Sequence, residues 1–360
     1  MKNKILMVCE AFGGGVFAYV SQLCNDLCDE FDVYLAYSVR PQTPKNYKEF
    51  MNSQVHLIEV KAFGGSLMDV VADIKAIKEL RKIANEVQPD IIHLHSSIAG
   101  GLGRLAYNEK NGYRLIYTPH GYAHILMGDE RSLHCKLYKY IEILLGKKKH
   151  LTLTCCESEN EVARTLTKRT AYVETGINIK DFQSTIDPIV PKKHGKFTVY
   201  AMGRICSQKR PDLFNAIAER VPEANFIWIG TGELQRLLTA DNITITGWKA
   251  RHEALAMGKG ADVYILCSFG EAIAMSLVEN MYMEKLCLVS NTMGNKSVIK
   301  NGVNGYVCSE VDEYVKYIKE AMRDFPQHIA EQAKKDVIEH YNTGRMRDDY
   351  IRFYNSVIDG

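Results

Sequence analysis

The 360-residue sequence lacks the features that would assign some functions at once. It contains no Asp-x-Asp motif, which removes a common carboxylate clamp for a metal-bound diphosphate. None of its ten cysteines forms a Cys-x-x-Cys pair, so a zinc ribbon and a thioredoxin-type motif are excluded. No stretch approaches the roughly 18 apolar residues of a membrane span. The formal net charge of +2 gives no global field that would attract nucleic acid.

What the sequence does contain is typical of a soluble globular protein. Apolar residues make up 46% of the chain and charged residues 24%. The N-terminal stretch MKNKILMVCEAF has a short apolar run, but it lacks the long apolar region and the small-residue cleavage site of a signal peptide. We therefore predict a cytoplasmic protein whose cysteines serve as small apolar side chains in a reducing compartment.

Short apolar stretches alternate with segments of helical periodicity along the whole chain. The first half has predicted strands at KILMV (4–8), 31–38, 53–60, 89–96, 113–121 and 150–159. The second half has predicted strands at 197–203, 224–230, 242–247, 261–268 and 285–291. A helix with one polar and one apolar face is expected over 66–87. This alternation favours an α/β protein with mainly parallel sheets.

One stretch interrupts the alternation. QSTIDPIVPKKHGK, at 183–196, holds two prolines and several polar residues and has no periodicity, which is typical of a linker. We therefore predict an N-terminal domain over 1–183, a linker over 184–196 and a second domain over 197–335. Ligands of doubly wound sheets bind beyond the carboxyl ends of the strands, so the expected site is a cleft between the two domains.

Small and basic residues follow the predicted strands of the second half. Gly203 and Arg204 end one strand, and Lys209 lies in the loop after it. An arginine fork and a lysine point charge suit a diphosphate, although two solvated surface cations would give the same pattern. Gly230 and Gly232 mark a tight turn at which backbone could approach a ligand.

Further along, aromatic and acidic residues occupy similar positions. Trp248 and Lys249 follow a strand, where the tryptophan is either an exposed aromatic for a nucleobase or a core residue. The stretch SFGEAIAMSLVENM places Glu271 and Glu279 eight residues apart at a loop-to-helix junction. Ser268 and Glu271 also fit a Ser-x-x-Glu capping box at a helix start. Since an unpartnered carboxylate is costly to desolvate, the pair otherwise indicates a polar ligand.

In their order along the chain, these motifs resemble the donor-binding half of the retaining GT-B glycosyltransferases of family 4. The matching set is Gly203-Arg204-x(4)-Lys209, Gly230-x-Gly232, Gly247, Ser268-x-x-Glu271-x(7)-Glu279 and NGVNGYV at 301–307. The first half matches through its glycine-rich loop at 13–15, PDIIHLHS, TPHG, CCESE and ETGINIKDF. The resemblance covers nearly the whole chain. It implies two Rossmann-like domains facing across a cleft, with a C-terminal helix over 336–360 that packs back on the first domain.

The resemblance also implies roles for individual residues. Arg204 and Lys209 would neutralise the donor diphosphate, Glu271 would lie near hydroxyls of the transferred sugar, and Glu279 would bind the nucleotide ribose. His120 would face the transferred sugar and completes the implied catalytic set. The other implied donor contacts are Gly14, Gly15, Gly203, Gly230, Trp248, Lys249 and the backbone of Ala274 and Met275 at a helix N-terminus. Sugar selectivity does not carry over, because Ala-Ile-Ala stands at 272–274, where the family often has Gly-Phe-Gly.

A protein of this kind would move a hexose-type sugar, with retention and without a metal, from a UDP- or dTDP-type donor. The acceptor would be a sugar or a lipid-linked oligosaccharide in capsule, O-antigen or exopolysaccharide assembly, and no cofactor is implied. A nonhydrolysing sugar-nucleotide epimerase of the same architecture and a binding protein with a dead site remain as alternatives. Intact Arg204, Lys209, Glu271 and Glu279 count against the dead site.

An NAD-dependent oxidoreductase is a further alternative, because Gly13-x-Gly15-x-x-Ala18 matches the dinucleotide fingerprint. Two observations oppose it. Four residues separate the predicted strand KILMV from Gly13, and the second strand ends in Ala-Tyr-Ser at 36–38, without an acidic residue for a ribose.

Two other features of the first half leave their interpretation open. His93 and His95 share one face of a strand, but with His120 they lack a carboxylate at ligand spacing, so no metal site is predicted. HCKLYKYIEILLGKKKH, at 134–150, mixes basic and aromatic residues with an apolar helical face. It is either an ordinary amphipathic core helix or a contact with the anionic inner face of the cell membrane.

Overall fold

The structure, a computed structural model, describes residues 2–63, 70–107, 112–128, 132–192 and 194–360. The chain divides into two compact units, the first made of 1–124, 131–175 and 343–360 and the second of 125–130 and 176–342. The expected linker over 184–196 therefore falls inside the second unit, with residue 193 outside the described ranges. The reason is helix α7 (Ile179–Ile186), whose C-terminal carbonyl at Ile186 accepts a hydrogen bond from Lys259 Nζ at 2.8 Å.

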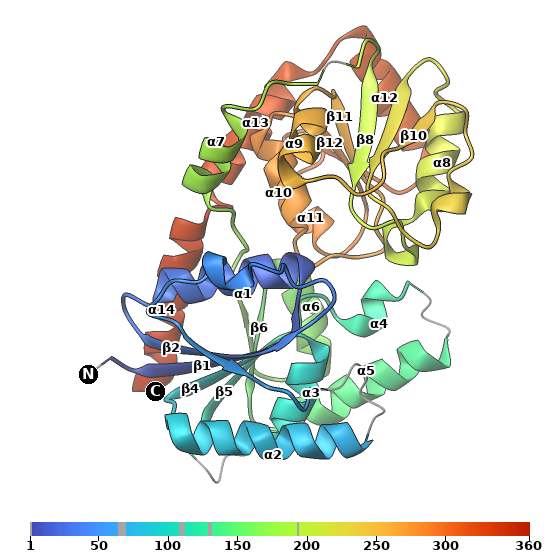
Figure 1. Cartoon of the computed structure of the whole chain (residues 1–360). Helices are drawn as coiled ribbons and strands as arrows, with labels where there is room; N and C mark the ends of the chain where they lie inside the picture. Colours follow the sequence, from blue (N-terminus) through green and yellow to red (C-terminus); the bar gives the residue numbers. More distant parts are fainter. Residues whose placement is uncertain (1, 64–69, 108–111, 129–131, 193) are drawn as a thin grey trace. The chain divides into compact units, whose positions relative to one another are not determined.

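The first unit is built on a seven-stranded sheet of order β3-β2-β1-β4-β5-β6-β7 (Figure 1). All of its pairings are parallel. Its strands are β1 (Lys4–Phe12), β2 (Asp32–Val39), β3 (His56–Glu59), β4 (Ile91–His95), β5 (Arg114–Thr118), β6 (Leu151–Thr154) and β7 (Thr170–Tyr172). The six strands expected in this half are confirmed, whereas β7 was not predicted, because its Thr-Ala-Tyr sequence has neither an apolar run nor an apolar alternation.

Helices cover both faces of this sheet, with α1 on one face and α2 on the other (Figure 1). The helices are α1 (Gly14–Leu27), α2 (Val70–Val87), α3 (Ser97–Ala106), α5 (Leu133–Gly146), α6 (Glu157–Leu166) and α14 (Thr343–Asp359), with a 3-10 turn at Tyr47–Phe50. The short helix α4 (Ala123–Leu126) spans the boundary between the two units. The helix expected over 66–87 is observed as α2, and its first four expected residues lie outside the described ranges. The C-terminal helix α14 packs on α1, and the hydroxyls of Tyr19 and Tyr350 lie 2.6 Å apart.

Strand β1 is longer than the apolar run KILMV because its one acidic residue is satisfied internally. Glu10 is 4% exposed, and its carboxylate accepts hydrogen bonds from the Ser96 hydroxyl and from the Ala99 backbone N–H, the latter at 3.0 Å. A buried carboxylate with such donors does not end a strand. As a result β1 runs on to Phe12 and ends directly before Gly13.

The second unit repeats the architecture with a six-stranded parallel sheet of order β10-β9-β8-β11-β12-β13. Its strands are β8 (Thr198–Met202), β9 (Asn225–Ile229), β10 (Ile243–Ile245), β11 (Val263–Leu266), β12 (Leu286–Ser290) and β13 (Tyr306–Cys308). The five expected strands are confirmed, and β13 is the addition. The carboxyl ends of β8, β9 and β11 bring the loops after 202, 229 and 266 to one edge of the sheet.

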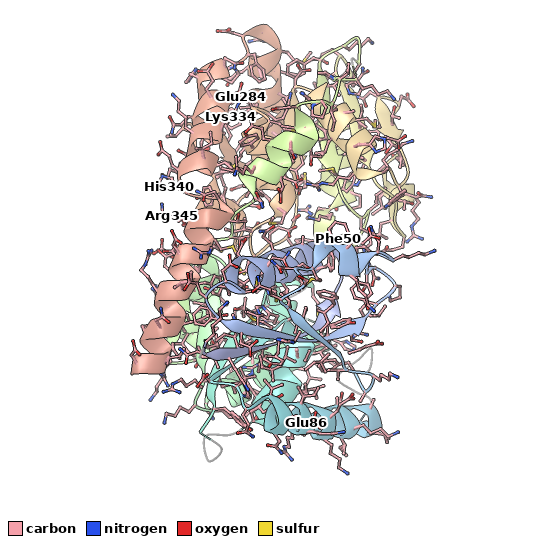
Figure 2. All side chains as sticks on the ribbon, turned by 60° about the vertical axis from the view of Figure 1, so that its left-hand side comes forward. Phe50, Glu86, Glu284, Lys334, His340 and Arg345 are labelled. Atoms are coloured by element: carbon pink, nitrogen blue, oxygen red, sulfur yellow. The ribbon has the colours of Figure 1, made fainter. Side chains whose placement is uncertain are left out.

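Helices cover the second sheet on both sides (Figure 1). Besides α7, the helices are α8 (Pro211–Glu219), α9 (Arg251–Lys259), α10 (Met275–Tyr282), α11 (Asn295–Val298), α12 (Val311–Arg323) and α13 (Gln327–Glu339), with 3-10 turns at Ser207–Lys209 and Gln235–Leu237. Phe214 of α8 packs edge-on against Trp228 of β9, with ring centroids 5.0 Å apart. On the outer side Lys334 of α13 and Glu284, which follows α10, form an ion pair at 2.7 Å (Figure 2).

The ten cysteines lie within the described residues, where all are buried and none forms a disulfide, as expected. Among the described helices, none combines the length and the apolar character that crossing a membrane requires.

Candidate functional site

In the second unit, the predicted glycines at the strand ends are explained by close packing. Gly203 follows β8 and Gly230 follows β9, both with positive φ. A Cβ on Gly230 would lie 2.1 Å from the carbonyl oxygen of Gly203, so no other residue fits. That same carbonyl accepts a hydrogen bond from Trp228 Nε1 at 3.0 Å. Gly230 therefore fixes the distance between two strand-end loops, which is a structural reason independent of any ligand.

The first charged pair of this edge joins Lys209 to Glu271. Lys209 Nζ donates to Glu271 Oε1 at 2.7 Å, and the side chains are only 19% and 13% exposed. Hydrogen bonds hold their loops together, since the Phe269 backbone N–H donates to the carbonyl of Gln208 at 2.9 Å and the Gln208 side-chain amide donates to the carbonyl of Gly270 at 3.0 Å. Two predicted residues 62 positions apart thus form one half-buried pair of opposite charges.

The second charged pair joins Glu279 to a residue that the sequence did not single out. Arg251 Nη2 donates to Glu279 Oε1 at 2.7 Å. The Glu279 side chain is 9% exposed, whereas Arg251, at the start of α9, is 61% exposed. Nothing in the spacing around Arg251 distinguishes it from other surface arginines, so sequence reasoning had no signal for it.

The capping-box interpretation of Ser268 and Glu271 is wrong. Helix α10 begins at Met275 with Ala274 at its N-cap and no side-chain cap, so Ser268 lies well before the helix. The Ser268 hydroxyl is buried and has no hydrogen-bond partner within the described residues. The Glu271 loop is instead fixed by Gly294, where a Cβ would lie 2.3 Å from the Glu271 carbonyl oxygen. The carboxylate of Glu271 is thus free of a capping role.

Three other predicted residues of this unit lie at the surface. Arg204 is exposed, and its guanidinium makes no hydrogen bond or ion pair with the part of the chain that the structure describes. Trp248 is 78% exposed, so the core alternative is wrong for it, and the buried tryptophan is Trp228. Lys249 beside it is half-buried. An exposed aromatic ring is costly to leave in water and is typical of a contact surface.

In the first unit, both ring nitrogens of His120 have partners. His120 Nε2 lies 2.9 Å from His95 Nδ1, and His120 Nδ1 lies 3.4 Å from Cys155 Sγ. The edge of the Tyr19 ring packs on the imidazole, with centroids 4.6 Å apart. Burial lowers the pKa of His120 to about 3, so the ring is neutral at pH 7. Within the described residues, no group of three or more His, Cys, Asp or Glu side chains is arranged to hold a metal ion.

The glycine-rich loop of the first unit has room beside it. Gly14 adopts φ +54°, and a Cβ on Gly14 or Gly15 would meet no heavy atom within 4 Å. Packing therefore does not explain Gly15, which leaves approach of a ligand as an explanation. One argument against the NAD alternative is wrong, because β1 reaches Phe12 and Gly13 does stand at the strand end. The missing acidic residue after β2 still opposes that alternative.

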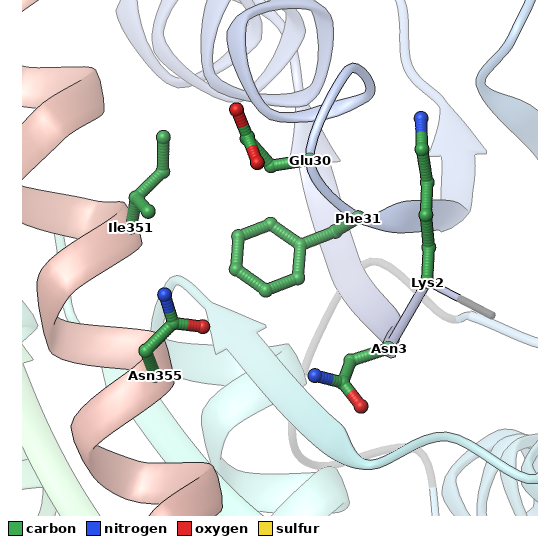
Figure 3. Close-up of a pocket in the computed structure, with 6 residues that line it drawn as sticks. All are labelled: Lys2, Asn3, Glu30, Phe31, Ile351 and Asn355. Carbon is green, nitrogen blue, oxygen red and sulfur yellow. The ribbon is translucent and has the colours of Figure 1, made fainter.

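A pocket of about 470 Å³ in the first unit contains none of the predicted residues (Figure 3). It is lined by Lys2, Asn3, Glu30, Phe31, Ile351 and Asn355. Asn3 and Phe31 precede β1 and β2, so this pocket lies at the amino ends of the strands. Ligands of parallel sheets bind at the opposite edge.

Comparison with known families assigns both halves of the chain. Residues 13–181 match the model described as Glycosyltransferase Family 4, and residues 182–336 match the model described as Glycosyl transferases group 1. The chain belongs to the family 4, group 1 glycosyltransferases. This confirms the resemblance found in the sequence, and membership of this family does not favour the epimerase or the oxidoreductase.

Curated relatives are similar over most of the chain. One is the UDP-Gal:alpha-D-GlcNAc-diphosphoundecaprenol alpha-1,3-galactosyltransferase of Escherichia coli, 24% identical over 79% of this chain and 81% of the relative. Another is the O-antigen biosynthesis glycosyltransferase WbnH of Escherichia coli, 23% identical over 95% of this chain and 97% of the relative.

Solved structures share the fold. Sucrose-phosphate synthase from Thermosynechococcus elongatus matches with a TM-score of 0.80 and 15% identity, over 99% of this chain and 100% of that one. Anabaena HepE in complex with UDP and glucose matches with a TM-score of 0.75 and 16% identity, over 98% and 100%. Together with the two parallel sheets, these likenesses confirm the GT-B fold of this glycosyltransferase.

Proposed function

We propose that this glycosyltransferase moves a hexose-type sugar, with retention, from a nucleotide diphosphate sugar to a sugar or lipid-linked oligosaccharide. UDP or dTDP is the proposed nucleotide, and no cofactor is needed. The role in capsule, O-antigen or exopolysaccharide assembly is supported by the curated relatives, one of which is named for O-antigen biosynthesis and another for galactosyl transfer to a diphosphoundecaprenol-linked sugar.

The observation that carries this proposal is the pair of charge clusters at the carboxyl edge of the second sheet. Lys209 and Glu271 form one cluster and Arg251 and Glu279 the other, each joined at 2.7 Å. Each carboxylate engages its cation through one oxygen, so the second oxygen can accept hydrogen bonds from vicinal hydroxyls. In a nucleotide sugar, the ribose and the transferred sugar both present such hydroxyls. The diphosphate that joins them is negatively charged and needs cations.

We assign the roles along the donor as the family resemblance implies them, and these contacts are compatible with that assignment. Glu279 binds the ribose, and Lys209 and the exposed Arg204 bind the diphosphate, helped by the backbone N–H groups of Ala274 and Met275 at the start of α10. Glu271 binds the transferred sugar. Trp248 and Lys249 lie beside the base, and Gly203, with φ +135°, leaves space for Lys209 to extend past it.

The chemistry follows from where charge develops. As the glycosidic bond breaks, negative charge grows on the departing nucleotide diphosphate, and cations already in place lower the barrier. Lys209 is held by Glu271 before the donor arrives, so little reorganisation is needed. In this proposal Lys209 and Arg204 do the work of a divalent metal.

A donor screen tests the proposal. The purified chain is titrated with UDP, dTDP, ADP and GDP and with their common sugar conjugates, and the melting temperature is recorded. We expect one nucleotide to raise it and its sugar conjugate to raise it further. Stabilisation by NAD with no response to any nucleotide sugar would contradict the proposal.

We also propose that helix α5 rests on an anionic membrane surface, where a lipid-linked acceptor would lie. Four apolar side chains at helical spacing are exposed on this helix: Leu133 81%, Leu137 45%, Tyr140 58% and Leu144 43%. Lys136, Lys139 and Lys147 are exposed beside them. Cys135 and Leu145 bury the other side of the helix, so the apolar stripe is surplus to the core.

Vesicle sedimentation tests this contact. The chain should sediment with vesicles containing about 30% phosphatidylserine and less with phosphatidylcholine alone, because about 1 kcal/mol per lysine favours the anionic surface. The double variant Leu133→Ser, Leu137→Ser should lose binding. Val71→Ser, Ile74→Ser on α2, where both residues are also exposed, is the matched control and should bind normally. Equal sedimentation of both double variants would refute a role for α5.

A further inference from the structure

A line of four side chains in the first unit connects His120 to three residues that have no part in the proposed function. It runs from Met7 on β1 through His95 at the end of β4 to His120 and on to Cys155 after β6. Met7, His95 and Cys155 are at most 1% exposed. None of these contacts involves a carboxylate or a cation, so the direction of each hydrogen bond is set by donors and acceptors alone.

Met7, at one end of this line of side chains, determines which atoms of the other three carry a proton. Met7 Sδ lies 3.4 Å from His95 Nε2, and a thioether has no proton to give, so His95 Nε2 carries the proton. A neutral His95 then has its lone pair on Nδ1, which must accept from His120 Nε2–H at 2.9 Å. His120 in turn has its lone pair on Nδ1, which accepts from the Cys155 thiol at 3.4 Å.

The electrostatics agree with this neutral arrangement. Burial lowers the pKa of His95 well below its usual value and that of His120 to about 3. Burial together with the nearby Glu159 raises the pKa of the Cys155 thiol, so Cys155 keeps its proton. The backbone beside the ring is held as well, because the buried Glu159 carboxylate accepts from the N–H groups of Gly121 at 2.6 Å and Cys155 at 2.9 Å.

We propose that His95 and Cys155 are positioning residues that hold His120 as the neutral tautomer with its proton on Nε2. Both ring nitrogens are then occupied by partners within the first unit, so the imidazole is held in one orientation. In this arrangement His120 does not act as a general acid. The effect of His95 and Cys155 on the rate of sugar transfer rests on the proposed function. The tautomer of His120 does not depend on it.

The direct test is ¹⁵N NMR of the full chain labelled at histidine, at pH 7, with His120→Gln to assign its signals. We expect His120 to show a protonated Nε2 and an unprotonated Nδ1. Protonation at Nδ1, or at both nitrogens, would overturn the proposal. Cys156→Ala is the matched control, because Cys156 is equally buried and its Sγ lies 3.5 Å from the Ser158 hydroxyl; the His120 signals should not change.

Activity provides the second readout, with the nucleotide sugar identified in the donor screen. His95→Ala and Cys155→Ala should lower kcat by about 10- to 100-fold with the donor KM nearly unchanged. His95→Asn keeps a hydrogen-bond acceptor and Cys155→Ser keeps a donor, so each should restore most of kcat. Failure of both conservative variants to restore kcat would refute the positioning roles. If wild type shows the expected tautomer but no transfer, the proposed function fails and the tautomer assignment stands.

Discussion

Substitution of Glu279 by alanine is the sharpest perturbation of the proposed donor site. The Glu279 carboxylate is 9% exposed, and its Oε1 is engaged by Arg251 at 2.7 Å, which leaves the other oxygen for a ribose hydroxyl. Loss of a hydrogen bond to a charged acceptor costs about 1.5–3 kcal/mol. Since each 1.4 kcal/mol is a factor of ten, the Kd for the bare nucleotide should rise about 10- to 150-fold.

The variant should bind more weakly without unfolding. Arg251 is 61% exposed and can be hydrated when its partner is removed, so the loss of this ion pair should cost about 1 kcal/mol of stability or less. Isothermal titration calorimetry with UDP, or with the nucleotide found in the screen, gives the Kd. A melting curve of each variant without ligand checks the fold.

Two companion variants make the result specific. Glu271→Ala should leave bare-nucleotide affinity nearly unchanged while lowering turnover of the whole donor, because Glu271 contacts the sugar in our assignment. Glu284→Ala removes another glutamate ion-paired at 2.7 Å, but with Lys334 on the outer side of the unit, and should change neither quantity (Figure 2). Equal losses of nucleotide affinity in Glu279→Ala and Glu271→Ala would refute the division of roles.

Three further predictions test the chemistry and the protonation state of His120. Lys209→Ala and Arg204→Ala should each lower kcat/KM by about 100-fold or more, as for loss of a preorganised electrostatic group, and a near-wild-type rate for both would rule out their role. Activity should survive EDTA, and loss that Mg²⁺ or Mn²⁺ restores would mean that a metal holds the diphosphate. Because burial depresses the pKa of His120 to about 3, its neutral form stabilises the fold above pH 6.5, and this stability is lost as the pH falls from 6.5 toward 3. Urea titrations at pH 7 and pH 5 should show a smaller acid loss in His120→Gln than in wild type, at up to about 1.4 kcal/mol per pH unit, and identical losses would contradict the burial of a neutral imidazole.

The alternation of apolar and helical stretches was sufficient to predict the two parallel sheets, because a buried parallel strand is a short apolar run. It failed where the pattern was short or polar. Strand β7 (Thr-Ala-Tyr) has no apolar alternation, unlike the equally short β10 (Ile-Thr-Ile), which was predicted. Glu10 concealed the end of β1, since its partners Ser96 and Ala99 are far along the chain. Because the end of β1 was placed too early, Gly13 was wrongly separated from the strand in the case against the NAD alternative.

The site was predictable as a set of residues but not as a set of contacts. The order of motifs located Lys209, Glu271 and Glu279, yet their ion pairs depend on loops brought together by the sheet order. Arg251 carries no sequence signal because its role arises only from the position of α9 next to α10. The sequence predicts that Gly230 lets the backbone approach a ligand. The structure gives a different reason for a glycine at this position, which is its close contact with the carbonyl of Gly203.

The central claim is sugar transfer from a nucleotide donor through the Lys209–Glu271 cluster. The most direct measurement follows one reaction by mass spectrometry, with the chain, the nucleotide sugar from the donor screen and a synthetic lipid diphosphate-linked sugar acceptor. The account predicts that the acceptor gains the mass of one sugar for each nucleotide diphosphate released, and that Lys209→Ala slows both events together. An epimerised nucleotide sugar without nucleotide release, or transfer at the same rate in Lys209→Ala, would contradict it.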